Sequence, residues 1–392
     1  MKIGILTLHS QTNYGGVLQA FALQETLKSL GHDVVIIDRW MDVHNCTLKG
    51  ITASRSFVGW CKFLVRMVLG FGDGADYIRH LRTARMLPSL LKLTPYHFYH
   101  WRDAPIDLGV DVVIVGSDQV WNPKLQGAEL PYLLDGAPPV PAIAYAASFG
   151  TQRLPADMES RYEAGFKRFK AISVREREGA EIVEMLNCEA IHVLDPTILA
   201  DRNIWDRFSR GKSGRKRKRL VCYLIQDPLG FVIKDIGTFA NEQDCDVEIF
   251  FGGPCYVLPS NLKELAQIST GFLRAFLRRN VHVHAMATPD EFVREIAIAD
   301  WVLTDSFHAL MFSTIFRKNV RVLRPRSGRG SAGFARLEEF VNDYLKTNVL
   351  CETYQEAFDS FLNYQTTDYN ESLLKSHQEQ SLSWLEAALR GI

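Results

Sequence analysis

The sequence has no excess of charge and no long apolar run. Its 392 residues include 45 Lys and Arg against 45 Asp and Glu, so the formal net charge is zero. Without a basic excess, no overall field attracts nucleic acid, and we predict no nucleic-acid partner. No apolar stretch reaches the roughly 18 residues that a membrane-spanning helix needs. The N-terminus has no basic segment followed by a cleavage signal, so we predict a cytoplasmic protein.

Cysteine is sparse and its spacing is irregular. There are seven cysteines, an odd number, and no two of them form a Cys-x-x-Cys pair. This pattern argues against a disulfide framework and against a structural zinc site. We also find no cluster of residues with metal-ligand spacing, so we predict neither a metal nor a cofactor.

Two segments leave contact with a membrane surface open. Residues 57–71 are apolar but are interrupted by Lys62 and Arg66, which lie one helical turn apart. They predict either a packed helix whose basic side chains reach water or a helix on a membrane surface. Residues 211–219 form a basic run with two glycines, typical of a solvated linker or of a segment that touches anionic lipid. Peripheral contact with the inner face of the membrane is therefore one interpretation.

Strands and helices alternate along most of the chain. Residues 2–8 read as a buried strand, a helix begins at Gly15 and Gly16, and residues 34–37 read as a second strand. The full G-x-G-x-x-G fingerprint is missing, which argues against a dinucleotide site. The alternation predicts an α/β fold with two doubly wound domains. We place them at 1–205 and 206–350, followed by a helical segment, 351–392, that packs back toward the first domain.

Polar loops follow two of the first domain's strands, where an open parallel sheet binds ligands. The first loop contains Asn13, Tyr14 and Gly15, which suit either a close approach of the backbone to an anion or sugar, or simply a turn that needs glycine. The second follows a strand at residues 111–115. Its amide, carboxylate, hydroxyl and indole groups suit a sugar, or else form a turn whose indole is in the core; these residues are Ser117, Asp118, Gln119 and Trp121.

A strand-to-helix turn in the second half is the strongest catalytic candidate. Residues 304–308 present a hydroxyl at Thr304, a carboxylate at Asp305, a hydroxyl at Ser306 and an imidazole at His308. The N-terminus of the following helix suits an anion, and a histidine can move protons near neutral pH. The alternative is an N-capping turn in which the histidine is simply packed. A loop rich in glycine and arginine follows, typical of an anion-binding loop or of a solvated basic loop; it includes Arg324, Arg326 and Arg336.

These motifs, in this order, resemble the polysaccharide pyruvyl transferases. The resemblance rests on residues 13–19, 115–122, 145–150, 173–176, 194–197 and 304–308. It implies a fold similar to GT-B glycosyltransferases, with two Rossmann-like domains facing a cleft. It also implies transfer of the enolpyruvyl-derived group of phosphoenolpyruvate to two hydroxyls of a sugar. The product is a pyruvate ketal on a cell-surface or capsular polysaccharide precursor, and phosphate is released.

The resemblance also implies roles for particular residues. Arg175 helps to hold phosphoenolpyruvate, and His308 is catalytic. The imidazole is our candidate acid for the enol carbon, Asp305 its candidate orienting group, and Asp118 the candidate acceptor of a hydroxyl proton. Some branches of the family have an arginine two residues before the histidine; here Ser306 stands there, so another arginine would complete the phosphate site.

The partners we predict are phosphoenolpyruvate, as donor substrate, and a sugar acceptor carried on a lipid. Two other functions remain open. One is a GT-B-like glycosyltransferase that uses a nucleotide sugar in polysaccharide biosynthesis. The other is a scaffold protein that binds a sugar or a lipid carrier without catalysis, since fold alone does not settle function.

Overall fold

The chain forms two compact units in the computed structural model. Unit 1 comprises Met1–Val43, Ala84–Ile204 and Glu371–Ile392, and unit 2 comprises His44–Thr83 and Trp205–Asn370. The structure describes residues 1–9, 13–40, 72–125, 130–209, 217–225, 229–250, 278–325, 331–363 and 366–392. Residues 57–71, residues 211–216 of the basic run and Arg326 lie outside these ranges, so the interpretations placed on them stay predictions.

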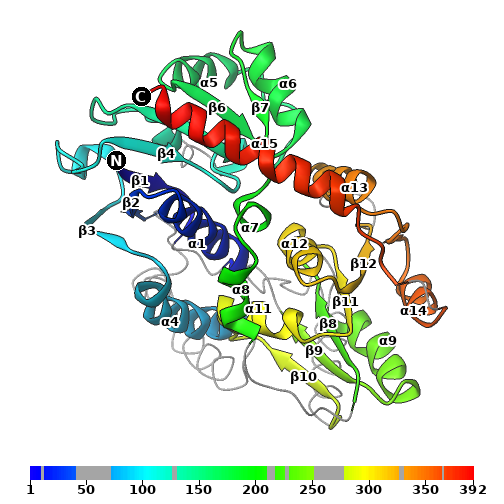
Figure 1. Ribbon diagram of the computed structural model, residues 1–392. Coiled ribbons are helices and arrows are strands. Elements are labelled where there is room, and N and C mark those ends of the chain that lie inside the picture. Colours follow the sequence, from blue (N-terminus) through cyan, green and yellow to red (C-terminus); the bar gives the residue numbers. More distant parts are fainter. Residues whose placement is uncertain are drawn as a thin grey trace. The chain divides into compact units, whose positions relative to one another are not determined.

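Unit 1 is built on a seven-stranded sheet in which all neighbouring strands are parallel (Figure 1). The strand order is β3-β2-β1-β4-β5-β6-β7. The strands are β1 Lys2–Leu6, β2 Asp33–Arg39, β3 Leu93–Phe98, β4 Val112–Val115, β5 Ala142–Ala147, β6 Ala171–Val174 and β7 Ile191–His192. Strands β4 and β5 are buried along their whole length, as expected for the centre of a parallel sheet covered on both faces.

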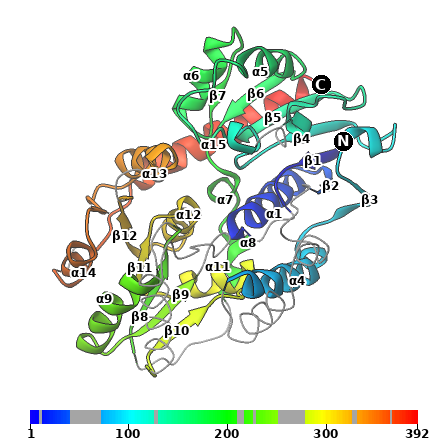
Figure 2. The same ribbon diagram turned by 180° about the vertical axis from the view of Figure 1, so that it is seen from behind.

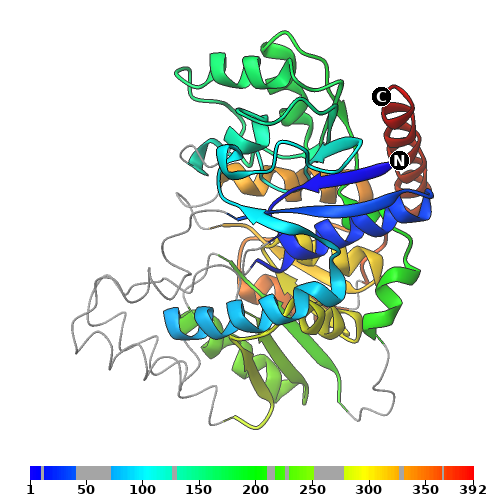
Figure 3. The same ribbon diagram turned by 90° about the vertical axis from the view of Figure 1, so that its left-hand side faces the viewer.

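Helices cover this sheet. They are α1 Tyr14–Ser29, α5 Glu159–Phe166, α6 Arg177–Met185, α7 Pro196–Leu199 and α15 Glu371–Arg390, with short 3-10 turns at Trp101–Asp103, Pro123–Leu125 and Leu130–Leu133. Helix α1 lies along one face beside β1 and β2 (Figure 3). Helix α15 packs beside β5 (Figure 2), and Ser381 Oγ accepts the Leu194 N–H at 3.0 Å. The last helix is therefore part of unit 1.

Unit 2 repeats the same plan with six parallel strands in the order β10-β9-β8-β11-β12-β13. They are β8 Arg219–Tyr223, β9 Asp246–Phe250, β10 Val281–His284, β11 Trp301–Thr304, β12 Asn319–Leu323 and β13 Leu350–Cys351. The helices are α9 Leu229–Glu242, α11 Pro289–Ala297, α12 Phe307–Ile315, α13 Ser331–Tyr344 and α14 Tyr354–Leu362. Helix α4, Gly72–Leu90, belongs to unit 2 up to Thr83, and α8, Asn203–Ser209, from Trp205.

Each sheet has the strand order of a Rossmann fold, so the predicted α/β class with two Rossmann-like units is confirmed. The first strand of each unit neighbours both the second and the fourth, so the order reverses between β1 and β4 and again between β8 and β11. Ligands bind such sheets outside the carboxyl ends of the strands at this reversal. No helix in the described part of the chain combines the length and the apolarity needed to span a membrane.

Candidate functional site

In unit 1 the reversal point is occupied by the loop Gly116-Ser117-Asp118, which follows β4. Gly116 has φ +116°, and a Cβ there would lie 2.3 Å from the Tyr145 carbonyl oxygen, so only glycine fits. Asp118 also has a positive φ, of 66°, a conformation that Asp tolerates better than most residues. The chain thereby turns sharply at the end of the strand and exposes only 5% of Asp118.

Ser117 fixes this loop to its neighbours. Its N–H donates to Gln19 Oε1 at 3.1 Å, its Oγ donates to the Ala146 carbonyl at 2.9 Å, and its own carbonyl accepts from Thr7 Oγ1 at 2.9 Å. Gln19 Nε2 also donates to Thr7 Oγ1 at 2.8 Å. We predicted Ser117 as a substrate contact. In the structure it is fully buried, and its hydrogen bonds connect β4 to α1, to β5 and to the end of β1 next to Asp118.

Trp121 was predicted to face a sugar, and that prediction is wrong because the indole is completely buried. Its Nε1 donates to the Tyr132 carbonyl at 3.1 Å, and its ring packs on Phe166 at 4.8 Å and Phe149 at 5.5 Å between centroids. It is a core residue, as the alternative interpretation held. Gln119, by contrast, is half-buried, and its Oε1 accepts from Asn122 Nδ2 at 2.8 Å.

The N-terminus of α1 reaches the same place. Asn13 caps the helix, its Oδ1 accepting the Gly15 N–H at 3.0 Å, and Tyr14 is buried. A Cβ on Gly16 would lie 2.6 Å from the Leu8 carbonyl oxygen and 3.4 Å from Asp118 Oδ2. Gly16 therefore lets the helix approach the β1 loop and leaves the Asp118 carboxylate beside a helix N-terminus, where negative charge is favoured.

Arg175, which follows β6, is enclosed by carboxylates. Its Nη1 lies 2.7 Å from Asp195 Oδ2, its Nε 3.3 Å from Glu176 Oε1, and its Nη2 3.5 Å from Asp118 Oδ1. We call these four residues the Arg175 cluster. Burial opposes the charged form, but the carboxylates of Glu176, Asp195 and Asp118 outweigh it and raise the pKa of Arg175. One guanidinium against three carboxylates leaves a formal charge of −2.

This arrangement changes the expected role of Arg175. Its side chain is 1% exposed, so an anion could bind it only by displacing a carboxylate. The guanidinium pairs with Asp195, Glu176 and Asp118, and its contact with phosphoenolpyruvate stays a prediction. Asp195 is fixed in turn, because its Oδ1 accepts the Thr197 N–H at 2.9 Å and thereby caps α7. Within the described residues no group of carboxylates, histidines and cysteines is arranged to hold a metal ion.

No local sequence pattern indicates the Arg175 cluster. Glu176 and Asp195 belong to motifs that were noted, but neither was assigned to a site. The available signal was that Arg175 and Glu176 directly follow β6, and that Asp195 lies three residues after β7, the neighbouring strand of the parallel sheet.

In unit 2 the side chains of Thr304 and Asp305 form hydrogen bonds across the reversal point. Thr304 Oγ1 donates to the Tyr223 carbonyl at 2.6 Å and accepts the Ser306 N–H at 2.9 Å. Asp305 Oδ1 accepts the Ile225 N–H at 2.6 Å. Both side chains thus tie the loop after β11 to the end of β8. The proposed contact of Asp305 with the imidazole stays a prediction.

His308 lies in the first turn of α12, after the N-cap residue Ser306, and is 7% exposed. Its ring meets the Phe307 ring edge-on, with centroids 5.6 Å apart and planes at 88°. The guanidinium of Arg336, from α13, lies over the same Phe307 ring at 5.3 Å. A cation and the imidazole therefore contact one aromatic ring at a helix N-terminus.

Arg324 forms ion pairs with two carboxylates of unit 2. Its Nη2 lies 2.6 Å from Glu338 Oε1 and its Nε 3.0 Å from Glu352 Oε1. Of Arg324 and Arg336, it is therefore Arg336 that lies beside Phe307, the ring that His308 also contacts.

Comparison with solved structures finds the same fold in sugar-nucleotide enzymes at low sequence identity. The UDP-GlcNAc 2-epimerase from Neisseria meningitidis bound to UDP-GlcNAc is 12% identical, with a TM-score of 0.54 and coverage of 100% of both chains. That from Methanocaldococcus jannaschii, in complex with UDP-GlcNAc and UDP, is 12% identical, with a TM-score of 0.51 and coverage of 97% of this chain and 98% of the other. These likenesses establish a GT-B-like fold of two Rossmann-like units.

The comparison of sequences is more specific. A comparison with curated proteins finds no match. The sequence model of the family described as "Polysaccharide pyruvyl transferase" matches residues 13–327, which is most of the chain and includes every motif on which the resemblance rested. The chain therefore belongs to the polysaccharide pyruvyl transferase family.

Proposed function

We propose that this protein transfers the enolpyruvyl-derived group of phosphoenolpyruvate to two hydroxyls of a sugar, forming a pyruvate ketal and releasing phosphate. The acceptor is a precursor of a cell-surface or capsular polysaccharide, carried on a lipid at the inner face of the membrane. The observation that carries the proposal is the family match over residues 13–327. The surroundings of His308 and Asp118 support it.

The donor is assigned to the His308 turn. Phosphoenolpyruvate carries a phosphate and a carboxylate, and the first turn of α12 offers backbone N–H groups and a positive partial charge. Arg336 adds a full positive charge beside Phe307. It therefore takes the place of the arginine that some branches of the family have at the position of Ser306. His308 donates a proton to the enol methylene carbon, which becomes a methyl group and leaves C2 electrophilic.

The acceptor is assigned to Asp118. The first sugar hydroxyl adds to C2 and gives its proton to the carboxylate. Phosphate then leaves C2, and the second hydroxyl adds with loss of its own proton. The products are the ketal and inorganic phosphate. Asp118 suits this role because it is nearly buried and fixed by Arg175, so little reorganisation precedes proton transfer.

The proposal is tested by product analysis. The protein is incubated with phosphoenolpyruvate and a panel of galactose, mannose and N-acetylhexosamine acceptors, both lipid-linked and free. We expect phosphate release that depends on one acceptor, and a product heavier by one pyruvate ketal in mass spectrometry. His308→Ala should lower turnover by about 10²-fold or more, the usual range for an acid–base group. Activity like that of the wild type would remove His308 from the mechanism.

The role of Arg336 is tested against Arg324, which lies in the same unit but is paired with two carboxylates. We expect Arg336→Met to raise KM for phosphoenolpyruvate by about 10-fold or more, the loss of roughly one charge-assisted hydrogen bond. Arg324→Met should change it by less than about 2-fold, since its guanidinium is already neutralised. The reverse order would place the phosphate site elsewhere.

A nucleotide-sugar enzyme is the second candidate, because the Methanocaldococcus jannaschii neighbour contains UDP-GlcNAc and UDP. Thermal-shift titrations with UDP-sugars and with phosphoenolpyruvate separate the two. Stabilisation by a UDP-sugar, together with no phosphate release from phosphoenolpyruvate, would favour this candidate.

A further inference from the structure

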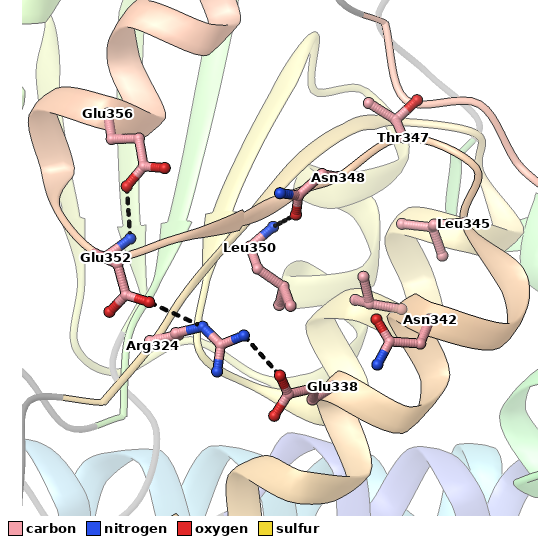
Figure 4. Close-up of a pocket in the computed structure, with 10 residues that line it drawn as sticks. Arg324, Glu338, Asn342, Leu345, Thr347, Asn348, Leu350, Glu352 and Glu356 are labelled. Carbon is pink, nitrogen blue, oxygen red and sulfur yellow. Dashed lines mark hydrogen bonds and ion pairs between the residues drawn. The ribbon is translucent and has the colours of Figure 1, made fainter.

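A polar groove of about 500 Å³ lies in unit 2, beside the edge strand β13 (Figure 4). Helix α13 forms one wall with Glu338, Val341 and Asn342, whose spacing puts them on one face of the helix, and Leu345 directly follows the helix. The other wall is formed by the turn at residues 347–348, by β13, and by the residues that lead into α14. None of the lining residues has a role in the proposed reaction, in which Arg324 serves only as the control for Arg336.

The charges in the groove exclude an anionic ligand. Arg324 bonds to Glu338 and Glu352, as Figure 4 shows, and Glu356 Oε2 accepts the Glu352 N–H at 2.7 Å. The hydrogen bond that Arg324 donates to Glu338 raises the pKa of Arg324, so the guanidinium stays charged. Three carboxylates against one guanidinium leave a formal charge of −2. A phosphate, a nucleotide or phosphoenolpyruvate would be repelled here.

A divalent cation is not favoured either. Among the described residues no set of carboxylates, histidines and cysteines is placed to hold a metal ion. One reason is that two of the three carboxylates already pair with Arg324. The negative charge of the groove disfavours an anion, and the pairing of its carboxylates with Arg324 disfavours a metal ion. A neutral ligand that forms hydrogen bonds therefore fits best.

The remaining lining suits a ligand rich in hydroxyl groups. Three aliphatic side chains, Val341, Leu345 and Leu350, offer a small apolar surface. Around it lie carboxylates, which accept, and the exposed amide of Asn342, which both donates and accepts. Hydroxyl groups also donate and accept, so a sugar ring can satisfy both kinds of partner. The volume lies within the range of about 300–1,000 Å³ that small-molecule sites occupy.

One end of the groove lies at the edge of the sheet that also carries the His308 turn, while Thr347 and Asn348 precede β13 and line the other end. Arg324 follows β12 and Glu352 follows β13, so both lie at the carboxyl edge of the sheet. The turn that leads to His308 follows β11 at the same edge, one strand further along. We propose that this groove binds a neutral sugar unit of the acceptor saccharide, remote from the sugar that receives the pyruvyl group. The choice of an acceptor chain rests on the function proposed above.

Binding is tested directly on the full-length protein. Neutral tetrasaccharides of glucose, galactose, mannose and N-acetylglucosamine are titrated by saturation-transfer NMR and calorimetry. We expect one of them to bind. Asn342→Ala should weaken that binding about 5-fold or more by removing an amide, and Asn342→Trp should abolish it by filling the groove. Gln355→Ala is the matched control, since it removes an exposed amide from α14 that does not line the groove.

The outcomes separate this proposal from the reaction itself. With a polymeric acceptor, both Asn342 variants should raise KM for the acceptor and leave KM for phosphoenolpyruvate and turnover on a short acceptor unchanged. If no phosphate is released with any acceptor, the proposed function is contradicted, but the NMR titration still tests whether the groove binds a sugar. Tetrasaccharide binding that neither Asn342 variant weakens would overturn the proposal, as would preferential binding of spermidine, which would make the groove a cation site.

Discussion

Replacing Arg175 by Met tests what this arginine does. The side chain is 1% exposed and joins Asp118, Glu176 and Asp195. Methionine keeps much of the apolar stem but removes the only positive charge of the Arg175 cluster, and the three carboxylates are left buried together. Removing one partner of a buried ion pair typically costs about 3–5 kcal/mol. We therefore expect Arg175→Met to lower the free energy of unfolding of unit 1 by an amount in this range.

The loss is large enough to measure by calorimetry. For a unit of this size, 1 kcal/mol shifts Tm by roughly 2–4 °C, so Arg175→Met should lower the transition of unit 1 by roughly 6–20 °C. Arg153→Met is the control, because Arg153 belongs to the same unit and is exposed. It should leave the transition within about 1–2 °C, as most surface substitutions do.

Kinetics then decide between the two roles of Arg175. If it holds Asp118, Arg175→Lys should lower kcat and leave KM for phosphoenolpyruvate nearly unchanged, since one ammonium cannot span three carboxylates. If it binds the donor, KM should rise instead. An Arg175→Met protein that unfolds at the wild-type temperature would refute the reasoning from burial, and a rise in KM alone would restore the role that the resemblance implied.

Two further predictions concern packing and acid stability. Gly16→Ala should lower the free energy of unfolding of unit 1 by about 1–3 kcal/mol in urea titrations, because its Cβ would lie 2.6 Å from the Leu8 carbonyl oxygen; an unchanged midpoint would contradict the close approach. The pKa of Glu248 is lowered, because the hydrogen bond from His284 and the charges of Arg219 and His284 outweigh the effect of burial, which alone would raise it. The contribution of Glu248 to the free energy of unfolding is therefore present above the ordinary Glu pKa of about 4.3. It is lost as pH falls through the lowered pKa. Urea titrations from pH 7 to 3 should show Glu248→Gln less stable at pH 7 and the difference shrinking at acid pH; a constant difference would contradict this.

The strands at the centre of both sheets could be predicted because they are continuous apolar runs. Strands are predicted at residues 2–8, at 111–115 and directly before the turn at 304–308, and the structure has β1, β4 and β11 there. The edge strand β3 was missed. Its sequence contains Pro95, and only β2 pairs with it, so a residue without an N–H is tolerated at this position. Edge strands lack the apolar signal that central strands carry.

The candidate site was predictable as a set of loops but not as a set of contacts. Each loop follows a strand, and the parallel topology brings the loops to one edge. Whether Trp121 faces a ligand or the core depends on Phe149, Phe166 and Tyr132, which come from separate segments. The partners of Arg175 likewise lie up to 57 residues away in sequence, so no local pattern shows that its charge is already used.

The two reversal points differ in charge, and this difference bears on which substrate each one takes. In unit 1 the Arg175 cluster carries a formal charge of −2, and Asp118 is its member beside α1. In unit 2 the turn contains one carboxylate, Asp305, and beside the Phe307 ring lie the guanidinium of Arg336 and the N-terminus of α12. A trianionic donor is repelled more strongly by the first than by the second, whereas a neutral hydroxyl group is free to approach a carboxylate. Under the proposed function, this difference in charge is the reason for assigning the anionic donor to the His308 turn and the neutral sugar hydroxyl to Asp118.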